Sequence, residues 1–150
     1  PERVLALVLL IPPTAWETRA GQAELYLQMA NVVDRHGVEP LIQAGRVLPP
    51  PDPFLGDADY RDRSAARLRA DDPVRLAAVF RGAATADLPR KDAIAGLDVP
   101  ALILAWTGDP GHPVSSAEAL ADLLPRSEVH LAETHDDLST WTETIVDFLR

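Results

Sequence analysis

The sequence predicts an α/β fold built on a parallel sheet, and three observations carry this prediction. A short apolar run, Ala101–Ala105 with Trp106 behind it, stops at the stretch TGDPGHP (107–113). Such a run, ended by Gly, Pro and Asp, is typical of a strand buried on both faces. Val4–Ile11 is a second run of this kind, which stops at two prolines. The last part of the chain alternates strand and helix patterns, which favours parallel strands with right-handed crossovers.

The segment after the first strand predicts helices. Thr14 is suited to cap a helix from about Ala15 to Arg35, with Glu17 as its capping-box partner. A short helix is expected over 38–45. The Pro-rich stretch Val47–Asp59 is expected to be a loop.

Three further segments before the central strand are compatible with helices. Tyr60–Ala70 is charged and helix-compatible, and Asp71-Asp72-Pro73 begins another helix that runs to about Arg81, because proline is favoured at the first helical position. Pro89–Gly96 is expected to be a short helix that leads into the strand at Ala101.

The C-terminal part completes a narrow sheet of about three strands. A helix capped by Ser115 or Ser116 should extend through Leu124. In Ser127–Ala132, apolar and polar residues alternate, which predicts a strand with one exposed face. The last helix should begin at Asp137 or Ser139, and its apolar stripe consists of Trp141, Ile145, Phe148 and Leu149.

The composition disfavours a nucleic-acid-binding, a membrane-spanning or a metal-binding protein. The chain has 150 residues, 47% of them hydrophobic, which is enough to bury a core. A formal net charge of −9 disfavours nucleic-acid binding. No apolar run is long enough to span a membrane. The chain contains no cysteine, which fits a cytoplasmic location, and its four histidines have no metal-ligand spacing. We therefore expect no metal and no cofactor.

Several passages in order resemble the C-terminal part of an α/β-hydrolase. The opening Pro1-Glu2-Arg3-Val4 before a strand is similar to the passage that follows the nucleophile-elbow helix in that family. Gly108-Asp109-x-x-x-Pro113 resembles the turn that carries the triad acid, and Ser127–Ala132 resembles the eighth strand. The run IAGLDVPALIL (94–104) and the closing helix 141–149 match as well.

The resemblance implies a domain organisation. Residues 1–13 and 90–150 would form the C-terminal part of a hydrolase core, with an incomplete α/β-hydrolase-like parallel sheet. Residues 14–89 would form a helical cap inserted after the first strand. The chain opens directly before a strand, so we also expect it to be part of a longer fold.

The resemblance also implies site residues. Asp109 would be the triad acid, and His135, just after the last strand, would be the triad histidine; Thr134 stands where the family usually has glycine. The residues alone favour an Asp109 that bonds backbone N–H groups of its turn, and His135 is equally suited to be a solvated loop residue. Thr14 and Trp16 would line a small-molecule substrate pocket, although Trp16 would serve as well in cap packing.

Two further groups have both a functional and a structural interpretation. His112, three residues after Asp109, is placed to contact Asp109 or a substrate, but a histidine in a Gly-His-Pro turn is also common as a structural residue. Asp136 and Asp137 are best explained as helix-capping residues.

The sequence contains neither the G-x-S-x-G nucleophile elbow nor an HGGG-like oxyanion segment. We therefore expect the nucleophile to lie in a missing N-terminal half of the core, and this chain alone to be inactive. The open edge of the first strand predicts association with that half or with a second copy, as a homo-oligomer. The alternative is a non-catalytic binding or assembly module on the same fold.

Overall fold

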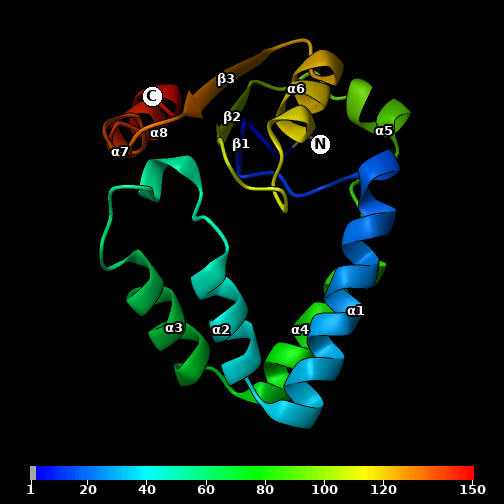
Figure 1. The fold of residues 1–150 in the computed structure, drawn as a ribbon. Helices are drawn as coiled ribbons and strands as arrows, with labels where there is room; N and C mark the ends of the chain where they lie inside the picture. Colours follow the sequence, from blue (N-terminus) through cyan, green and yellow to red (C-terminus); the bar gives the residue numbers. More distant parts are fainter. Residues whose placement is uncertain (1–2) are drawn as a thin grey trace. The chain divides into compact units, whose positions relative to one another are not determined.

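The computed structural model describes residues 3–150, which divide into two compact units. The sheet unit contains residues 3–14, 51–54 and 89–150, and the cap unit contains residues 15–50 and 55–88. Pro1 and Glu2, which begin the passage resembling the hydrolase family, lie outside the described residues. Figure 1 shows the helices and strands of both units.

The sheet unit contains three parallel strands in the order β1-β2-β3. Strand β1 spans Leu7–Leu10, β2 spans Ala101–Trp106 and β3 spans Ser127–Ala132. The predicted parallel sheet is confirmed. The central position of β2 explains its uninterrupted apolar sequence, because Ala101 through Ala105 are all buried.

Helices pack on this sheet. Helix α6 (Val114–Leu123) packs on β2 and β3, and α5 (Lys91–Ala95) packs against α6. Two more follow β3, namely α7 (His135–Ser139) and α8 (Trp141–Phe148). Leu102 and Leu104 are fully buried in a cluster with Ala132 and Trp141, which joins β2 to α8. Ile145 and Phe148 of the predicted apolar stripe pack against this cluster, whereas Leu149 lies after α8 and is 60% exposed.

The two outer strands differ from expectation. Hydrogen bonding of β1 begins at Leu7, whose N–H donates to the Pro100 carbonyl at 2.9 Å, because β2 offers no earlier partner. Strand β3 was expected to expose one face. All four residues from Glu128 to Leu131 are exposed instead, so the described part of the chain fully covers neither face of β3 over these residues.

Helix α7 begins earlier than predicted because of its cap. The Thr134 hydroxyl accepts a hydrogen bond from the Asp137 N–H at 3.2 Å, and the Asp137 carboxylate accepts from the Thr134 N–H at 2.9 Å. This reciprocal capping box makes His135 the first helical residue. Asp137 is thus a capping residue, as expected.

The cap unit consists of one short 3₁₀ helix and four α-helices. These are η1 (Trp16–Thr18), α1 (Arg19–His36), α2 (Glu39–Val47), α3 (Tyr60–Ala70) and α4 (Pro73–Thr85). Helices α1 and α4 pack along each other through Ala30, Val33, Leu76 and Ala77. Ala30 and Ala77 are fully buried, and their small side chains allow the two helix backbones to approach closely.

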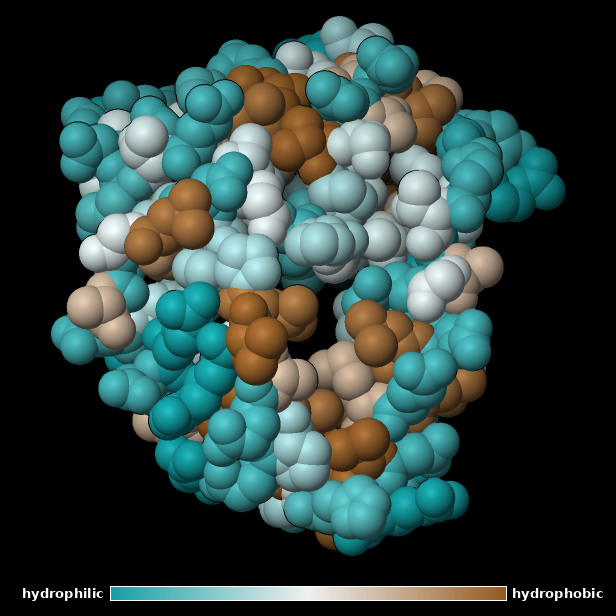
Figure 2. Space-filling view, viewed as in Figure 1, coloured by the Kyte–Doolittle hydropathy of each residue, from teal (hydrophilic) through white to brown (hydrophobic). Residues whose placement is uncertain are grey.

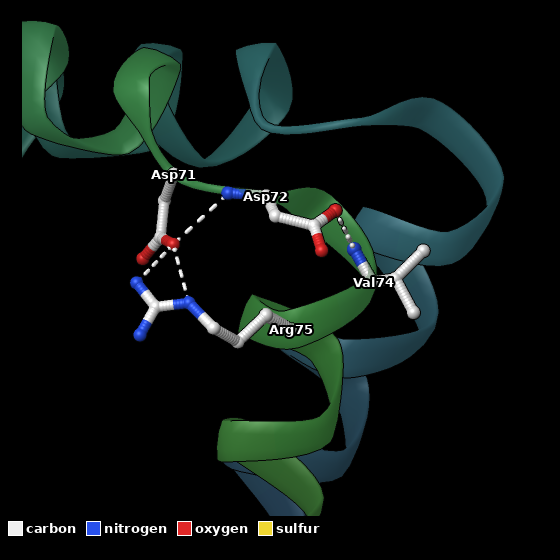
Figure 3. Close-up of polar contacts among 4 residues, drawn as sticks. All are labelled: Asp71, Asp72, Val74 and Arg75. Atoms are coloured by element: carbon white, nitrogen blue, oxygen red, sulfur yellow. Dashed lines mark hydrogen bonds and ion pairs between the residues drawn. The ribbon is translucent and has the colours of Figure 1, made fainter.

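The start of α4 follows from its sequence (Figure 3). The Asp72 carboxylate accepts a hydrogen bond from the Val74 N–H at 3.1 Å and so caps the helix. Asp71 forms an ion pair with Arg75 one turn later. Pro73 occupies the first helical position, where its missing N–H costs nothing. The predicted start of α4 is therefore confirmed, although α4 extends to Thr85.

The start of the cap differs from the predicted continuous helix. Trp16 has a φ of +50°, which is incompatible with a right-handed helix. The predicted helix is therefore interrupted there, and α1 begins only at Arg19. The N-cap of η1 is Ala15, whose N–H donates to the Thr18 hydroxyl at 3.1 Å, so the predicted capping pair of Thr14 and Glu17 is wrong. The Trp16 N–H donates to the Asp87 carboxylate, and Arg19 Nε donates to the Ala86 carbonyl at 2.8 Å. These bonds tie the two ends of the cap unit together.

The Pro-rich connection between α2 and α3 contains a second 3₁₀ helix, η2 (Asp52–Phe54). We expected residues 14–89 to form the cap, but residues 51–54 pack within the sheet unit. The Asp52 N–H donates to the Thr107 carbonyl at 3.0 Å, and η2 also packs against α7. This segment therefore belongs to the carboxyl edge of the sheet.

Apolar surface forms separate patches on the face drawn in Figure 2, where brown areas alternate with teal hydrophilic areas. The exposed apolar side chains of the cap helices include Leu25, Leu27, Val74 and Val79. Within residues 3–150, no helix combines the length and the hydropathy that crossing a membrane requires.

Candidate active site

Three loops meet at the carboxyl edge of the sheet, where sites form in open α/β folds. The loop after β1 contains Thr14, whose N–H donates to the Gly111 carbonyl at 3.1 Å. The loop after β2 carries Asp109. The loop after β3 leads to His135 and adjoins β2 through a bond from the Thr107 N–H to the Ala132 carbonyl, at 3.1 Å.

The turn after β2 requires a glycine at position 108. Gly108 has a φ of +78°, a backbone conformation that side chains disfavour. A Cβ at this position would also lie 2.3 Å from Asp52 Oδ1 and 2.8 Å from the Asp52 backbone nitrogen. Gly108 thus lets η2 approach the turn and sets the direction from which Asp109 leaves β2.

The Asp109 carboxylate accepts three hydrogen bonds from its own neighbourhood. Trp106 Nε1 donates to Oδ2 at 3.1 Å, and the Gly111 N–H donates to Oδ1 at 2.9 Å. His112 Nδ1 lies 3.0 Å from Oδ2. An ionised carboxylate only accepts, so Nδ1 of His112 carries the proton in this contact. Asp109 is therefore both a turn residue and the partner of an imidazole.

These contacts determine the charge of Asp109. Burial alone raises the pKa of this carboxyl, but the hydrogen bonds from His112 and Trp106 outweigh that effect. The charge of His112 and the Gly111 N–H act in the same direction, so the pKa of Asp109 falls to about 2. Asp109 is consequently an anion at every pH at which a histidine titrates.

Aromatic rings surround the Trp106 indole. The Phe54 ring meets it edge-on, with 5.4 Å between ring centroids and an interplanar angle of 83°. The Trp141 ring stacks against it at 6.1 Å and 14°. Phe54 comes from η2 and Trp141 from α8, so three distant parts of the sequence form this cluster.

His135 occupies the first position of α7 and is exposed. Within residues 3–150, no hydrogen bond or ion pair joins it to Asp109. The structure instead pairs Asp109 with His112. Both the loop of Asp109 and α7 contact η2, so His135 and Asp109 lie at the same edge of the sheet. Its assignment as the triad histidine stays a prediction.

The two residues expected to line a substrate pocket belong to different units. Thr14 is buried in the sheet unit, with 6% of its surface exposed, and its backbone bonds to the turn of Asp109. Trp16 belongs to the cap unit, and its N–H bonds to Asp87. The structure thus brings Thr14 to the candidate site, and the role of Trp16 stays a prediction.

Sequence reasoning missed Trp106, Phe54 and Asp52 at this edge. Trp106 was visible as the last residue of the strand, three residues before Asp109, which is close enough for a hydrogen bond. No local signal could have revealed Phe54, because more than fifty residues separate it from Trp106. Among residues 3–150, no group of three or more acidic or histidine side chains is placed to hold a metal ion.

No protein-family model and no curated protein matches this sequence. Solved structures do match. An esterase from Thermogutta terrifontis is 20% identical, with a TM-score of 0.75, and the match covers 99% of this chain and 56% of the esterase. A hydrolase from Pseudomonas aeruginosa PA01 is also 20% identical, with a TM-score of 0.76 and coverage of 99% and 57%.

An enol-lactonase from Burkholderia xenovorans LB400 matches with 22% identity and a TM-score of 0.70, over 99% of this chain and 57% of that enzyme. The chain therefore has the α/β-hydrolase fold, in the part that comprises the C-terminal strands and the cap region. It spans somewhat more than half the length of the structures it matches.

Proposed function

We propose that this chain contributes the triad acid and the histidine of a serine-type hydrolase that acts on an ester, an amide or a similar small substrate. Asp109 would be the acid and His135 the general base, and residues outside this chain would supply the nucleophile and the oxyanion hole. The observation that carries the proposal is the place of Asp109 at the carboxyl end of the central strand, where hydrogen bonds from Trp106, Gly111 and His112 hold its pKa well below the ordinary value.

An acid in this position has a defined task. The triad acid orients the histidine through one ring nitrogen and stabilises the imidazolium that forms when the other nitrogen takes the proton of the nucleophile. A carboxylate has about four acceptor positions, and Asp109 uses three of them within the described residues. One position on Oδ1 is left to accept a hydrogen bond from His135 Nδ1.

The likeness to an esterase and an enol-lactonase supports hydrolysis of an ester-like bond. In the proposed reaction, the nucleophile attacks the substrate carbonyl carbon and His135 accepts its proton. Collapse of the tetrahedral intermediate expels the leaving group, which takes that proton back from His135. Water then hydrolyses the acyl-enzyme by the same route. Asp109 stays ionised throughout.

The open edge of β1 supports the proposal that a further strand, from outside this chain, pairs with the sheet. Among the described residues β1 pairs only with β2, and Leu10 at its end is 54% exposed. We propose that the nucleophile-bearing half of the core pairs with β1, because an uncovered apolar edge strand recruits further strands. Without that half, this chain alone is expected to be inactive and to self-associate.

The lack of cysteine favours a cytoplasmic location.

Histidine variants test the proposal on the protein that includes the nucleophile. We expect His135→Ala to reduce kcat for a p-nitrophenyl ester by roughly 10³-fold or more. The matched control is His112→Ala, which removes the imidazole that contacts Asp109 in the structure and is expected to cost less than about 10-fold. The reverse order would overturn the role of His135.

A further experiment tests the acid. Asp109→Asn keeps the shape of the side chain but removes its charge, so kcat should fall by roughly 10²- to 10⁴-fold. Full activity in this variant would remove Asp109 from the mechanism. A reading frame without a G-x-S-x-G before Pro1 would remove the hydrolase proposal as a whole.

A further inference from the structure

We propose that Trp106 is a positioning residue for Asp109, and that its indole N–H, held in place by Phe54 and Trp141, directs the free acceptor position of the carboxylate to Oδ1. This inference rests on the proposed role of Asp109 as the triad acid. It adds a function for an aromatic cluster that neither the motif nor the likeness to other hydrolases assigns.

The hydrogen-bond geometry distinguishes the two carboxylate oxygens. Oδ2 accepts from both Trp106 Nε1, at 3.1 Å, and His112 Nδ1, at 3.0 Å. Among residues 3–150, Oδ1 accepts only from the Gly111 N–H, at 2.9 Å. Two donors saturate one carboxylate oxygen. Any further imidazole that binds Asp109 must therefore approach Oδ1, and Trp106 is one of the two groups that impose this direction.

The orientation of the indole follows from its neighbours. Trp106 is the last residue of β2, opposite Ala132, so its backbone is fixed by the sheet. An indole has two side-chain torsions, and the edge of Phe54 and the face of Trp141 restrict both. Its single N–H then points at Asp109, three residues later, without further adjustment.

Phe54 reaches this cluster only because η2 is anchored to the same turn. The Asp52 N–H donates to the Thr107 carbonyl, and the missing side chain of Gly108 leaves room for Asp52. Contacts therefore connect η2 to Asp109 in three steps. Asp52 bonds to Thr107, Phe54 packs against the Trp106 indole, and this indole donates a hydrogen bond to Asp109.

The test compares two tryptophans of the same cluster. Trp106→Phe keeps an aromatic ring in the stack but removes the N–H, whereas Trp141→Phe changes the stack and leaves the N–H in place. We expect the pKa of Asp109, followed by NMR of its labelled carboxyl carbon, to rise by about 1 pH unit in Trp106→Phe. In Trp141→Phe the rise should be less than a third of that.

A second measurement needs no tryptophan substitution. In Asp109→Asn at pH 7, the indole N–H resonance of Trp106 should shift further than that of Trp141, because only the former loses a charged acceptor. An unchanged pKa in Trp106→Phe, equal shifts in both tryptophan variants, or an unmoved Trp106 indole resonance would each overturn the proposal.

These NMR results are independent of the proposed hydrolysis. If Asp109→Asn retains full esterase activity while the Trp106 signals behave as expected, the catalytic role of Asp109 fails and the positioning of its carboxylate stands. In the hydrolase itself, Trp106→Phe should lower kcat by about 10-fold with little change in KM, since the indole touches the acid and not the substrate.

Discussion

Trp106 and Asp109 are joined by a hydrogen bond of 3.1 Å from the indole Nε1 to Oδ2, across the turn that ends the central strand. This bond links the buried sheet to a carboxylate whose pKa falls to about 2. It also connects Asp109 to η2, through Phe54, and to α8, through Trp141. The acid of the candidate site is thus held by its own turn, and the indole in that turn packs against rings from two other parts of the chain.

The low pKa of Asp109 predicts a stability effect in acid. Because its pKa is lower in the folded protein than the ordinary 3.8, ionised Asp109 contributes stability that is fully present above about pH 4. That contribution is lost as the pH falls through about 2. Between pH 7 and pH 3, wild type should lose about 1 kcal/mol of unfolding free energy that Asp109→Asn does not lose. Urea unfolding at both pH values measures this difference.

The matched control for that experiment is Asp122→Asn on α6, because Asp122 is exposed and makes no hydrogen bond or ion pair with the described residues. Its loss of stability between the two pH values should equal that of wild type. Equal acid sensitivity of wild type and Asp109→Asn would show that Asp109 is not held as an anion by the fold.

Gly108→Ala should destabilise the sheet unit by more than about 2 kcal/mol. An alanine at a positive φ costs about 1–2 kcal/mol, and its Cβ would also displace the Asp52 backbone. Gly96→Ala is the control, because Gly96 has a φ of −78° and its nearest neighbours are 3.6 Å away. We expect that control to be neutral or slightly stabilising in urea unfolding. Similar losses in both variants would contradict this account of the turn.

Asp72→Ala should cost about 1 kcal/mol, because it removes the N-cap of α4. Asp71→Ala should cost less, since it removes an ion pair with an exposed arginine. The two effects can be separated by salt. Thermal unfolding in 1 M NaCl should reduce the effect of Asp71→Ala and leave that of Asp72→Ala almost unchanged. Equal salt sensitivity would argue against this division of roles.

Leu104→Ala in β2 should cost about 2–5 kcal/mol, because the side chain is fully buried and leaves a cavity. Leu131→Ala in β3 makes the same chemical change at a side chain that is 41% exposed, and it should cost less than about 1 kcal/mol. Chemical denaturation of both variants compares a central strand with an edge strand. A cost at Leu131 equal to that at Leu104 would indicate that β3 is covered in solution.

The fold class and several element boundaries could be predicted from local sequence. The apolar run at Ala101–Trp106 became the buried central strand, and Asp72-Pro73 started α4, because each pattern depends on neighbours in the chain. Tyr60–Ala70 also matches its predicted range. Asp109 was recognised as the residue of interest because a carboxylate directly follows a buried strand.

Tertiary structure decided the remaining features. The exposure of β3 depends on which segments pack over its faces, and the interruption at Trp16 accompanies a bond to Asp87, far along the chain. No local pattern could place Phe54 against Trp106, since the packing energy of that pair arises only after the chain folds. The sequence by itself determined where the acid stands. The folded chain decided how the Trp106 indole that donates to Asp109 is held, because Phe54 and Trp141 come from segments that no local pattern relates to that turn.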